Sequence, residues 1–443
     1  VEEMDRLFDG FNLCEPNTSV SMTINGNYWW HLAAFFRVAH RQQIRIFEEE
    51  NGRPPDEKEV EELRKFTLSN VRGTVQADQL KEAMGQNTLV FNLDTSLKMM
   101  GDVAEYYVQN QIRNHYFVSI SGYHIAEAGA NPITQAALTL ANGLTYVELF
   151  RARGLDPNDF LHNFSWFFSN GMDPEYAVIG RVARRIWSIA MRDMYGVNEK
   201  GQKLKYHIQS SGRSLHAQEY TWNDYRTTLQ ALYALADNAN SLHTNSRDEA
   251  FGTPTEQTVR DAVAIQLILS KEYGLLQNEN PLQGSFVTSW LTKSVEEEIL
   301  RIFEEMSRRG GVLGALEVNY QRNRIQDESM VYEHRKHTGE IPIIGVNTFK
   351  DPDGVTLSAD DADSFDLEVT RSDEVEKRMV IERNIDFKTK NSEKSEAGIT
   401  LLKEAARNGE NLFEVMMDIV DHCTVGEVTK ALFEIGGQFR RNM

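Results

Sequence analysis

The chain has 443 residues, of which 41% are hydrophobic, so it is long enough to bury the core of one large domain or several smaller ones. Its 47 basic and 66 acidic residues give a formal net charge of −19, which argues against nonspecific binding to nucleic acid or to a membrane surface. The two cysteines, Cys14 and Cys423, are too few for a disulfide framework and indicate a reducing, cytoplasmic setting.

Strand-like segments alternate with helical patterns along the first two thirds of the chain. The six predicted strands are 19–26, 73–76, 117–124, 164–171, 205–212 and 240–245. A helical pattern follows each of them, at about 28–50, just after 76, and at about 133–153, 174–195, 219–237 and 255–273. This alternation predicts a parallel α/β architecture, which is either an open doubly wound sheet or a closed barrel.

One face of each predicted strand is polar and small. Ser21 and Thr23 alternate with apolar residues, as do Ser119 and Ser121 on a later strand. An open sheet that is covered by helices on both sides needs two apolar faces. The pattern therefore favours a barrel whose outside packs on helices and whose interior admits something polar, with satisfied buried hydroxyls as the alternative.

Eight strands close a TIM-type (β/α)8 barrel, and six are found here, so we expect the first strands to precede Val1. The predicted organisation is an incomplete barrel over 1–286, a helix and loop packing on it over 287–350, an acidic linker over 351–394 and a C-terminal helical extension over 395–443. Within that extension the periodicity predicts two helices, at about 395–408 and 411–440.

Polar side chains occur at the ends of the predicted strands, where barrel enzymes place their chemistry. They are Gln76, Tyr123, His124, Asn170, Ser211, His243 and Asn245. His124 could act as a general acid or donate a hydrogen bond to a carbonyl, or it could simply hold a loop. Tyr123 could stack on a flat ligand or serve only in packing.

Other motifs carry less information. Arg181, Arg184 and Arg185 share a predicted helix and could anchor a phosphate, although pairing with nearby acids explains them equally well. The histidines of "EHRKH" (333–337) lie in a predicted loop without a companion motif, so no metal ligand is assigned. Paired carboxylates, which a glycoside hydrolase would need, are absent from the predicted strand ends.

Several longer segments resemble the adenosylcobalamin-dependent acyl-CoA mutases, and in particular the substrate-binding region of the fused isobutyryl-CoA mutases. The resemblance extends from about residue 18 to 349, with looser similarity beyond. It is carried by "SVSMTING", "GTVQADQLKE", "SISGYHIAEAGANPI", "FFSNGMDPEYAVIGRVARRIW", "KYHIQSSGRSLHAQE", "NSLHTN", "NENPLQGSF" and "IPIIGVNTF".

The resemblance implies a barrel with coenzyme A along its axis and a radical rearrangement of the carbon skeleton. Positions matching the family's coenzyme A contacts are Ser21, Thr23, Thr74 and Arg181. Gln76, Tyr123 and His124 match its active-site positions. By analogy, His124 would donate a hydrogen bond to the thioester carbonyl, Tyr123 would press on the adenosyl group, and Gln76 would hold the substrate.

Gln86 matches a position at which methylmalonyl-CoA mutases carry an arginine, ten residues beyond Gln76. A buried carboxylate needs a bidentate cation, whereas a neutral glutamine favours an uncharged acyl chain. The expected reaction is thus the interconversion of isobutyryl-CoA and n-butyryl-CoA. Mutases of methylmalonyl-CoA, 2-hydroxyisobutyryl-CoA or pivalyl-CoA remain alternatives, as does a non-catalytic mutase-like subunit.

The family's D-x-H-x-x-G motif, whose histidine ligates cobalt, does not occur in this sequence. The resemblance implies that a cobalamin-binding domain and a GTPase chaperone domain on the same polypeptide supply that ligand and support the site. It also implies a homodimer. Alone, the chain is expected to be inactive.

Overall fold

A computed structural model describes residues 1–86, 88–274, 277–352 and 372–440. Its strands are β1 (Val20–Met22), β2 (Gly73–Val75), β3 (His115–Tyr116), β4 (Val118–Ser121), β5 (Phe164–Asn170), β6 (Tyr206–Ser210) and β7 (Ser241–His243). Because β3 and β4 are separated only by Phe117, they form two parts of one extended run. All six predicted strand regions are thus confirmed.

The strands are parallel and follow one another in chain order. One sheet has the order β1-β2-β3, and the other has the order β4-β5-β6-β7. The amide of Ser119 donates to the carbonyl of Gln76 (2.8 Å), so β4 continues from β2 where β3 ends. A doubly wound sheet reverses its strand order at a switch point, whereas a TIM-type barrel does not. The predicted class is therefore confirmed, although no pairing joins β7 to β1 among the described residues.

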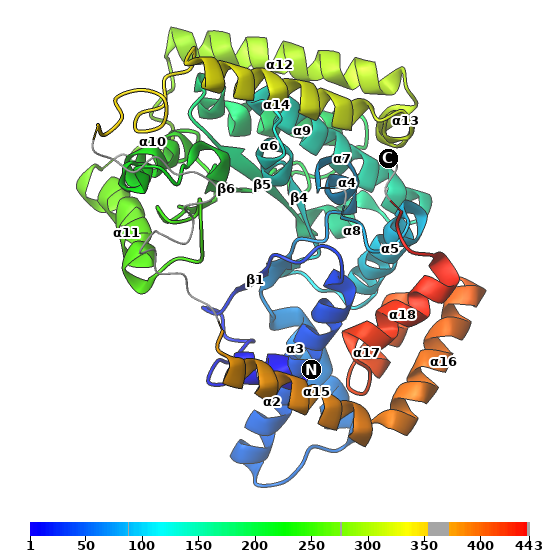
Figure 1. Cartoon of the computed structure of the whole chain (residues 1–443). Helices are drawn as coiled ribbons and strands as arrows, with labels where there is room; N and C mark the ends of the chain where they lie inside the picture. Colours follow the sequence, from blue (N-terminus) through cyan, green and yellow to red (C-terminus); the bar gives the residue numbers. More distant parts are fainter. Residues whose placement is uncertain (87, 275–276, 353–371, 441–443) are drawn as a thin grey trace.

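Helices surround the strands (Figure 1). The first part of the chain forms α1 (Glu2–Leu7), α2 (Tyr28–Asn51), α3 (Glu57–Asn70), α4 (Gln79–Lys81), α5 (Leu93–Gln109), α6 (Tyr123–Glu127), α7 (Pro132–Ala152), α8 (Pro157–Phe160), α9 (Ile179–Asp193), α10 (Asn223–Ala236) and α11 (Glu256–Leu267). Next come α12 (Phe286–Ser307), which packs across α7 and α9, α13 (Gly311–Glu317) and α14 (Tyr320–Thr338). Within the described ranges no helix has the length and apolar character of a membrane span.

Some predicted boundaries were wrong. The "EHRKH" stretch belongs to the end of α14 and is not a loop. The single helix predicted at 411–440 is two, α17 (Leu412–Ile419) and α18 (Val425–Gly436), because Thr424 and Glu427 form a capping box that starts a new helix.

Part of the predicted acidic linker is helical, since α15 spans Glu374–Lys390. The rest of that prediction, from 353 to 371, falls outside the described residues. Helix α16 (Ser392–Asn408) begins three residues before the predicted extension. Helix α17 packs on α2 and α5, which places the C-terminal helices beside the first half of the barrel (Figure 1).

The two faces of β2, β5 and β6 differ as predicted. In β4, however, Ser119 and Ser121 are buried and the Ser121 hydroxyl donates to the carbonyl of Ser119 (2.7 Å), so the alternative of satisfied buried hydroxyls holds there. Towards the helices the side chains are buried and mostly apolar: Val75, Val118, Ile120, Trp166, Phe168, Tyr206 and Ile208. On the opposite face of strands β2, β5 and β6, half-buried side chains occur, namely Thr74, Ser165, His207 and Gln209. Strands β2, β5 and β6 each have a neighbouring strand on both sides, so these half-buried side chains are not at a sheet edge. The inner face is therefore polar and partly open. This face leads to the candidate site.

Candidate functional site

Tyr123 and His124 open helix α6 directly after β4. Gly122 makes the sharp turn, and a Cβ at that position would lie 2.5 Å from Thr139 Oγ1 of α7. Because only glycine allows α7 to approach so closely, the first turn of α6 is held at the carboxyl end of β4. This is the edge at which parallel-strand enzymes place catalytic residues.

Aromatic rings line this end of the inner face. The Tyr123 ring stacks on Phe167 of β5, with centroids 4.9 Å apart and planes 4° from parallel. Phe167 in turn contacts His207 of β6 at 5.2 Å, while His124 meets the Tyr123 ring edge-on at 5.4 Å. The serine alternation did not predict this stack, which offers a flat apolar wall to a ligand.

A chain of hydrogen bonds crosses the strand ends beside the stack. Gln209 Nε2 donates to Tyr123 Oη (3.1 Å) and to Asn245 Oδ1 (2.8 Å). Asn245 is held in place in turn, because its backbone amide donates to Ser210 Oγ (2.8 Å). Burial raises the pKa of Tyr123 well above its ordinary value, so the phenol stays protonated at neutral pH.

His124 is neutral and partly unpaired. Burial, together with the nearby charge of Lys81, lowers the pKa of His124 to about 3. Its Nδ1 is buried and has no hydrogen-bond partner among the described residues. Buried polar atoms are almost always satisfied, so the missing hydrogen bond at Nδ1 marks His124 as a candidate functional residue.

Buried polar groups join the end of β2 to the end of β4. Asp78 accepts hydrogen bonds from the Ser121 amide (2.7 Å) and the Tyr146 hydroxyl (2.5 Å). The fully buried Lys81 ammonium lies 2.6 Å from Glu82 Oε1. Burial lowers the pKa of Lys81 and raises that of Asp78. Gln76, at the end of β2, is buried, and its Oε1 accepts from Asn25 Nδ2 (2.7 Å).

Gln86 ends a short π-helix, η1 (Glu82–Gln86), and its side chain is exposed. With its amide nitrogen facing Glu82, Gln86 donates to Glu82 Oε1 (2.9 Å). The η1 helix packs against α6: a Cβ at Gly85 would lie 3.7 Å from the carbonyl oxygen of His124. Single π-turns of this kind are frequent at functional sites.

The predicted coenzyme A residues fall in two places. Ser21 and Thr74 are neighbours in the β1–β2 register, and Thr23 follows just beyond β1. Ser21 and Thr23 are exposed, and Thr74 is half-buried. Arg181 lies apart on α9, where it donates to Asn280 Oδ1 (3.0 Å) and stands 4.0 Å from Asp237 Oδ1.

The other arginines of that segment also have partners. The partner of Arg185 is an acid, as the alternative interpretation expected, whereas that of Arg184 is a backbone carbonyl. Arg184 donates to the carbonyl of Asn238 (2.8 Å), and Arg185 lies 3.2 Å from Glu296. The structure therefore groups Gln76, Tyr123 and His124, with η1 beside them, and leaves the arginines on the helical layer.

Sequence reasoning missed Phe167, Gln209 and Glu127 as parts of this site. Phe167 interrupts the small-residue face of its strand, which is a signal that could have been followed. Glu127 lies four residues after Tyr123 and therefore on the same side of α6. The partners of both depend on how α6 packs, which no local pattern reveals.

A cavity of about 1060 Å³ lies beside the site. Its lining includes Ala126, Arg213 and Tyr332 but neither Tyr123 nor His124. The Arg213 guanidinium lies over the Tyr332 ring at 4.1 Å, and its buried Nη2 has no hydrogen-bond partner in the described part of the chain. The described residues contain no group of three or more side chains placed to hold a metal ion.

Comparison with known proteins places this arrangement in a family. The chain is 57% identical over its whole length to the fused isobutyryl-CoA mutase of Geobacillus kaustophilus, of which it covers 40%. It is 33% identical to the mitochondrial methylmalonyl-CoA mutase of Mus musculus, with all of this chain and 55% of the mouse protein aligned.

A third relative is the 2-hydroxyisobutanoyl-CoA mutase large subunit of Aquincola tertiaricarbonis, which is 31% identical over 99% of this chain and 73% of its own length. The chain spans 34–41% of the length of the fused relatives that it matches at 57% identity. Residues 59–438 match the family described as methylmalonyl-CoA mutase. The chain therefore belongs to the methylmalonyl-CoA mutase family.

Proposed function

We propose that the chain is the substrate-binding part of an adenosylcobalamin-dependent mutase that interconverts isobutyryl-CoA and n-butyryl-CoA. The observation that carries this proposal is the neutral imidazole of His124, whose buried Nδ1 lacks a partner in the described chain beside a polar strand face. The names of the relatives at 57% identity support the choice of substrate.

In this proposal the hydroxyls of Ser21, Thr23 and Thr74 contact the pantetheine arm along the inner face of the strands. Arg181 contacts the coenzyme from helix α9. The thioester end reaches the carboxyl edge of the strands. There His124 donates a hydrogen bond to the thioester carbonyl, and Gln76 orients the acyl group. The neutral imidazole carries one N–H group, and this group can donate the hydrogen bond to the carbonyl.

The family uses adenosylcobalamin, and the stack of Tyr123 on Phe167 offers a flat surface to an organic cofactor of this kind. Tyr123 offers a ring for the adenosyl group, and Arg213 offers an unpaired donor beside the cavity. When bound, the cofactor supplies the hydrogen abstraction and return that the rearrangement needs. We infer that the cobalt ligand comes from a cobalamin-binding domain of the same polypeptide, which also carries a GTPase chaperone domain and works as a cytoplasmic homodimer.

The test is turnover by the intact polypeptide with adenosylcobalamin. It compares isobutyryl-CoA, n-butyryl-CoA, methylmalonyl-CoA, 2-hydroxyisobutyryl-CoA and pivalyl-CoA as substrates. We expect isobutyryl-CoA and n-butyryl-CoA to interconvert with the highest kcat/KM. Equal turnover of methylmalonyl-CoA would refute the substrate assignment, and no turnover of any substrate would favour a non-catalytic subunit.

Gln86→Arg is expected to shift selectivity towards methylmalonyl-CoA. A hydrogen bond to a charged partner contributes about 1.5–3 kcal/mol, so the ratio of kcat/KM for methylmalonyl-CoA over isobutyryl-CoA should rise about 10-fold or more. Gln86→Glu is the matched control of opposite charge and should lower the same ratio. If both variants leave the ratio unchanged, Gln86 does not select the acyl group.

A further inference from the structure

The carboxylate of Glu127 ties the helix of Tyr123 and His124 to the loop after β6. Its Oε1 accepts hydrogen bonds from Ser211 Oγ (3.1 Å) and from the Gly212 amide (3.1 Å). Its Oε2 accepts from the Arg213 amide (2.7 Å). One side chain at the end of α6 thus serves two successive backbone donors of a loop about 85 residues further along the chain.

This contact is the second one between α6 and the end of β6, beside the one made by Tyr123. Gln209, two residues before the loop, already donates to Tyr123 Oη, so α6 meets the end of β6 through Tyr123 and again through Glu127. The approach is close: a Cβ at Gly212 would lie 3.2 Å from Glu127 Oε2 and 3.5 Å from Tyr123 Oη. Glycine at 212 leaves room for both side chains.

Helix α6 has only five residues, so its own hydrogen bonds do little to fix its orientation. Glu127 lies one turn after Tyr123, and a rotation of α6 would move both the phenol ring and the imidazole. If the carboxylate is removed, two backbone amides of the loop lose their acceptor, and the helix is freed from the loop at the same time.

We propose that Glu127 is a positioning residue of the mutase reaction. Through its hydrogen bonds to the β6 loop, it holds Tyr123 and His124 in their positions relative to the polar groups at the strand ends. The inference rests on the proposed function. Glu127 acts through the two aromatic residues, and its carboxylate is already occupied by loop donors. Its loss should therefore reduce kcat more than it weakens substrate binding.

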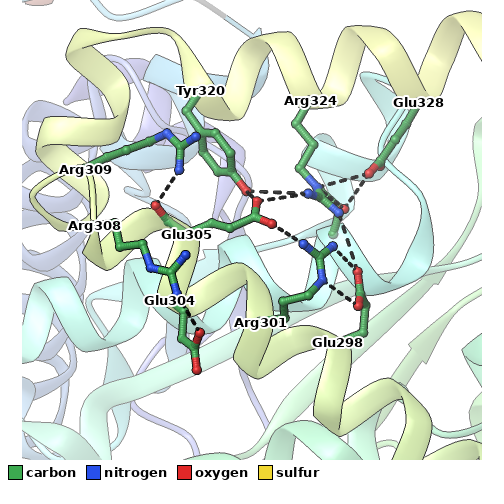
Figure 2. A network of polar contacts seen from close by, with 10 residues as sticks. Glu298, Arg301, Glu304, Glu305, Arg308, Arg309, Tyr320, Arg324 and Glu328 are labelled. Carbon is green, nitrogen blue, oxygen red and sulfur yellow. Dashed lines mark hydrogen bonds and ion pairs between the residues drawn. The ribbon is translucent and has the colours of Figure 1, made fainter.

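The chain offers a matched control on another helix, α14. Glu328 of α14 accepts from the Asn131 amide (2.8 Å) and from Thr134 Oγ1 (2.7 Å), which holds the start of α7. Figure 2 shows Glu328 at one end of a network of arginines and glutamates between α12 and α14, where it lies 3.2 Å from Arg324 Nε. Like Glu127, Glu328 is a half-buried carboxylate that accepts from a backbone amide. It lines the cavity beside the site but makes no bond to α6.

The experiment measures kcat and KM for isobutyryl-CoA in the intact polypeptide carrying Glu127→Gln, Glu127→Ala or Glu328→Gln. Misplaced catalytic groups commonly lose about 10²-fold in rate, so we expect roughly 100-fold lower kcat for Glu127→Ala with KM changed less than about threefold. Glu127→Gln keeps one acceptor oxygen and should lose about tenfold, which is a partial rescue. Glu328→Gln should keep kcat within about twofold while it lowers Tm.

A second readout follows the contact itself. Amide hydrogen exchange at Gly212 and Arg213 should accelerate in Glu127→Ala and remain unchanged in Glu328→Gln. If Glu127→Ala retains wild-type kcat, or if its kcat and KM change only as much as those of Glu328→Gln, the proposal is wrong. Should the alanine variant fail to fold, the glutamine variant decides the question in the same way.

The wild-type measurement separates the two proposals. Absence of mutase turnover in the wild-type polypeptide would overturn the proposed function and, with it, this inference. Normal wild-type turnover that persists in the Glu127 variants would overturn the positioning role alone.

Discussion

Replacement of His124 by alanine is expected to lower kcat of the intact mutase by a factor on the order of 10²–10³, which is the usual loss when one preorganised donor to a carbonyl oxygen is removed. His124 is the half-buried imidazole at the start of α6, and its Nδ1 has no protein partner in the described residues. A buried polar atom without a hydrogen bond is unusual in a folded protein and points to a functional role for the ring. Steady-state kinetics with isobutyryl-CoA would measure the loss.

His124→Asn is the control, because its amide can still donate a hydrogen bond and should recover part of the rate. Wild-type kcat should show no inflection from His124 near pH 6.5, since burial holds the pKa of the imidazole at about 3. Turnover by His124→Ala at nearly the wild-type rate would contradict the assignment of the thioester donor.

The low pKa of His124 also predicts how the stability of the protein depends on pH. The folded-state pKa of His124, about 3, lies below its ordinary value of 6.5, so the unfolded chain binds more protons between these two values. This group's contribution to the free energy of unfolding is therefore complete above pH 6.5 and is lost as the pH falls towards 3. His124→Ala should weaken the acid sensitivity of Tm in that window.

Asp102→Ala is expected to lower the free energy of unfolding by about 3 kcal/mol, because it removes a fully buried carboxylate that is the acceptor for two half-buried cations and a backbone amide. Asp102 is fully buried, and its carboxylate accepts from Lys98 Nζ (2.7 Å) and Arg153 Nη2 (2.7 Å). It also accepts from the Leu412 amide (3.0 Å) at the first residue of α17. One carboxylate thus joins α5 to the C-terminal helices.

Urea unfolding followed by circular dichroism would measure the effect. Glu105→Ala is the matched control: Glu105 also binds Arg153 (2.8 Å), but its side chain is 23% exposed and its contact with the C-terminal helices is one longer hydrogen bond from Asn411 Nδ2 (3.2 Å). We expect a loss of about 1 kcal/mol. If Asp102→Ala costs no more than Glu105→Ala, the buried cluster does not anchor the C-terminal helices.

Local patterns in the chain were sufficient for the strands and for most of the helices around them. Alternating serines and apolar residues marked the polar face of the strands, because side chains on a strand alternate between its two sides. The capping boxes that start α3 and α18 can also be read locally, since Asp56 with Glu59 and Thr424 with Glu427 lie three residues apart. Helices α3, α5, α13 and α14 were nevertheless missed, and α15 was taken for linker.

The amino-acid sequence by itself determined the parallel α/β class, the polar inner face and the place of Tyr123 and His124 at a strand end, because these follow from periodicities of a few residues. Only the tertiary structure decided that Phe167 stacks on Tyr123, that Glu127 binds the β6 loop and that Asp102 reaches Leu412. Each of these contacts joins residues at least 40 positions apart. Their geometry depends on how whole elements pack, and no local pattern encodes that.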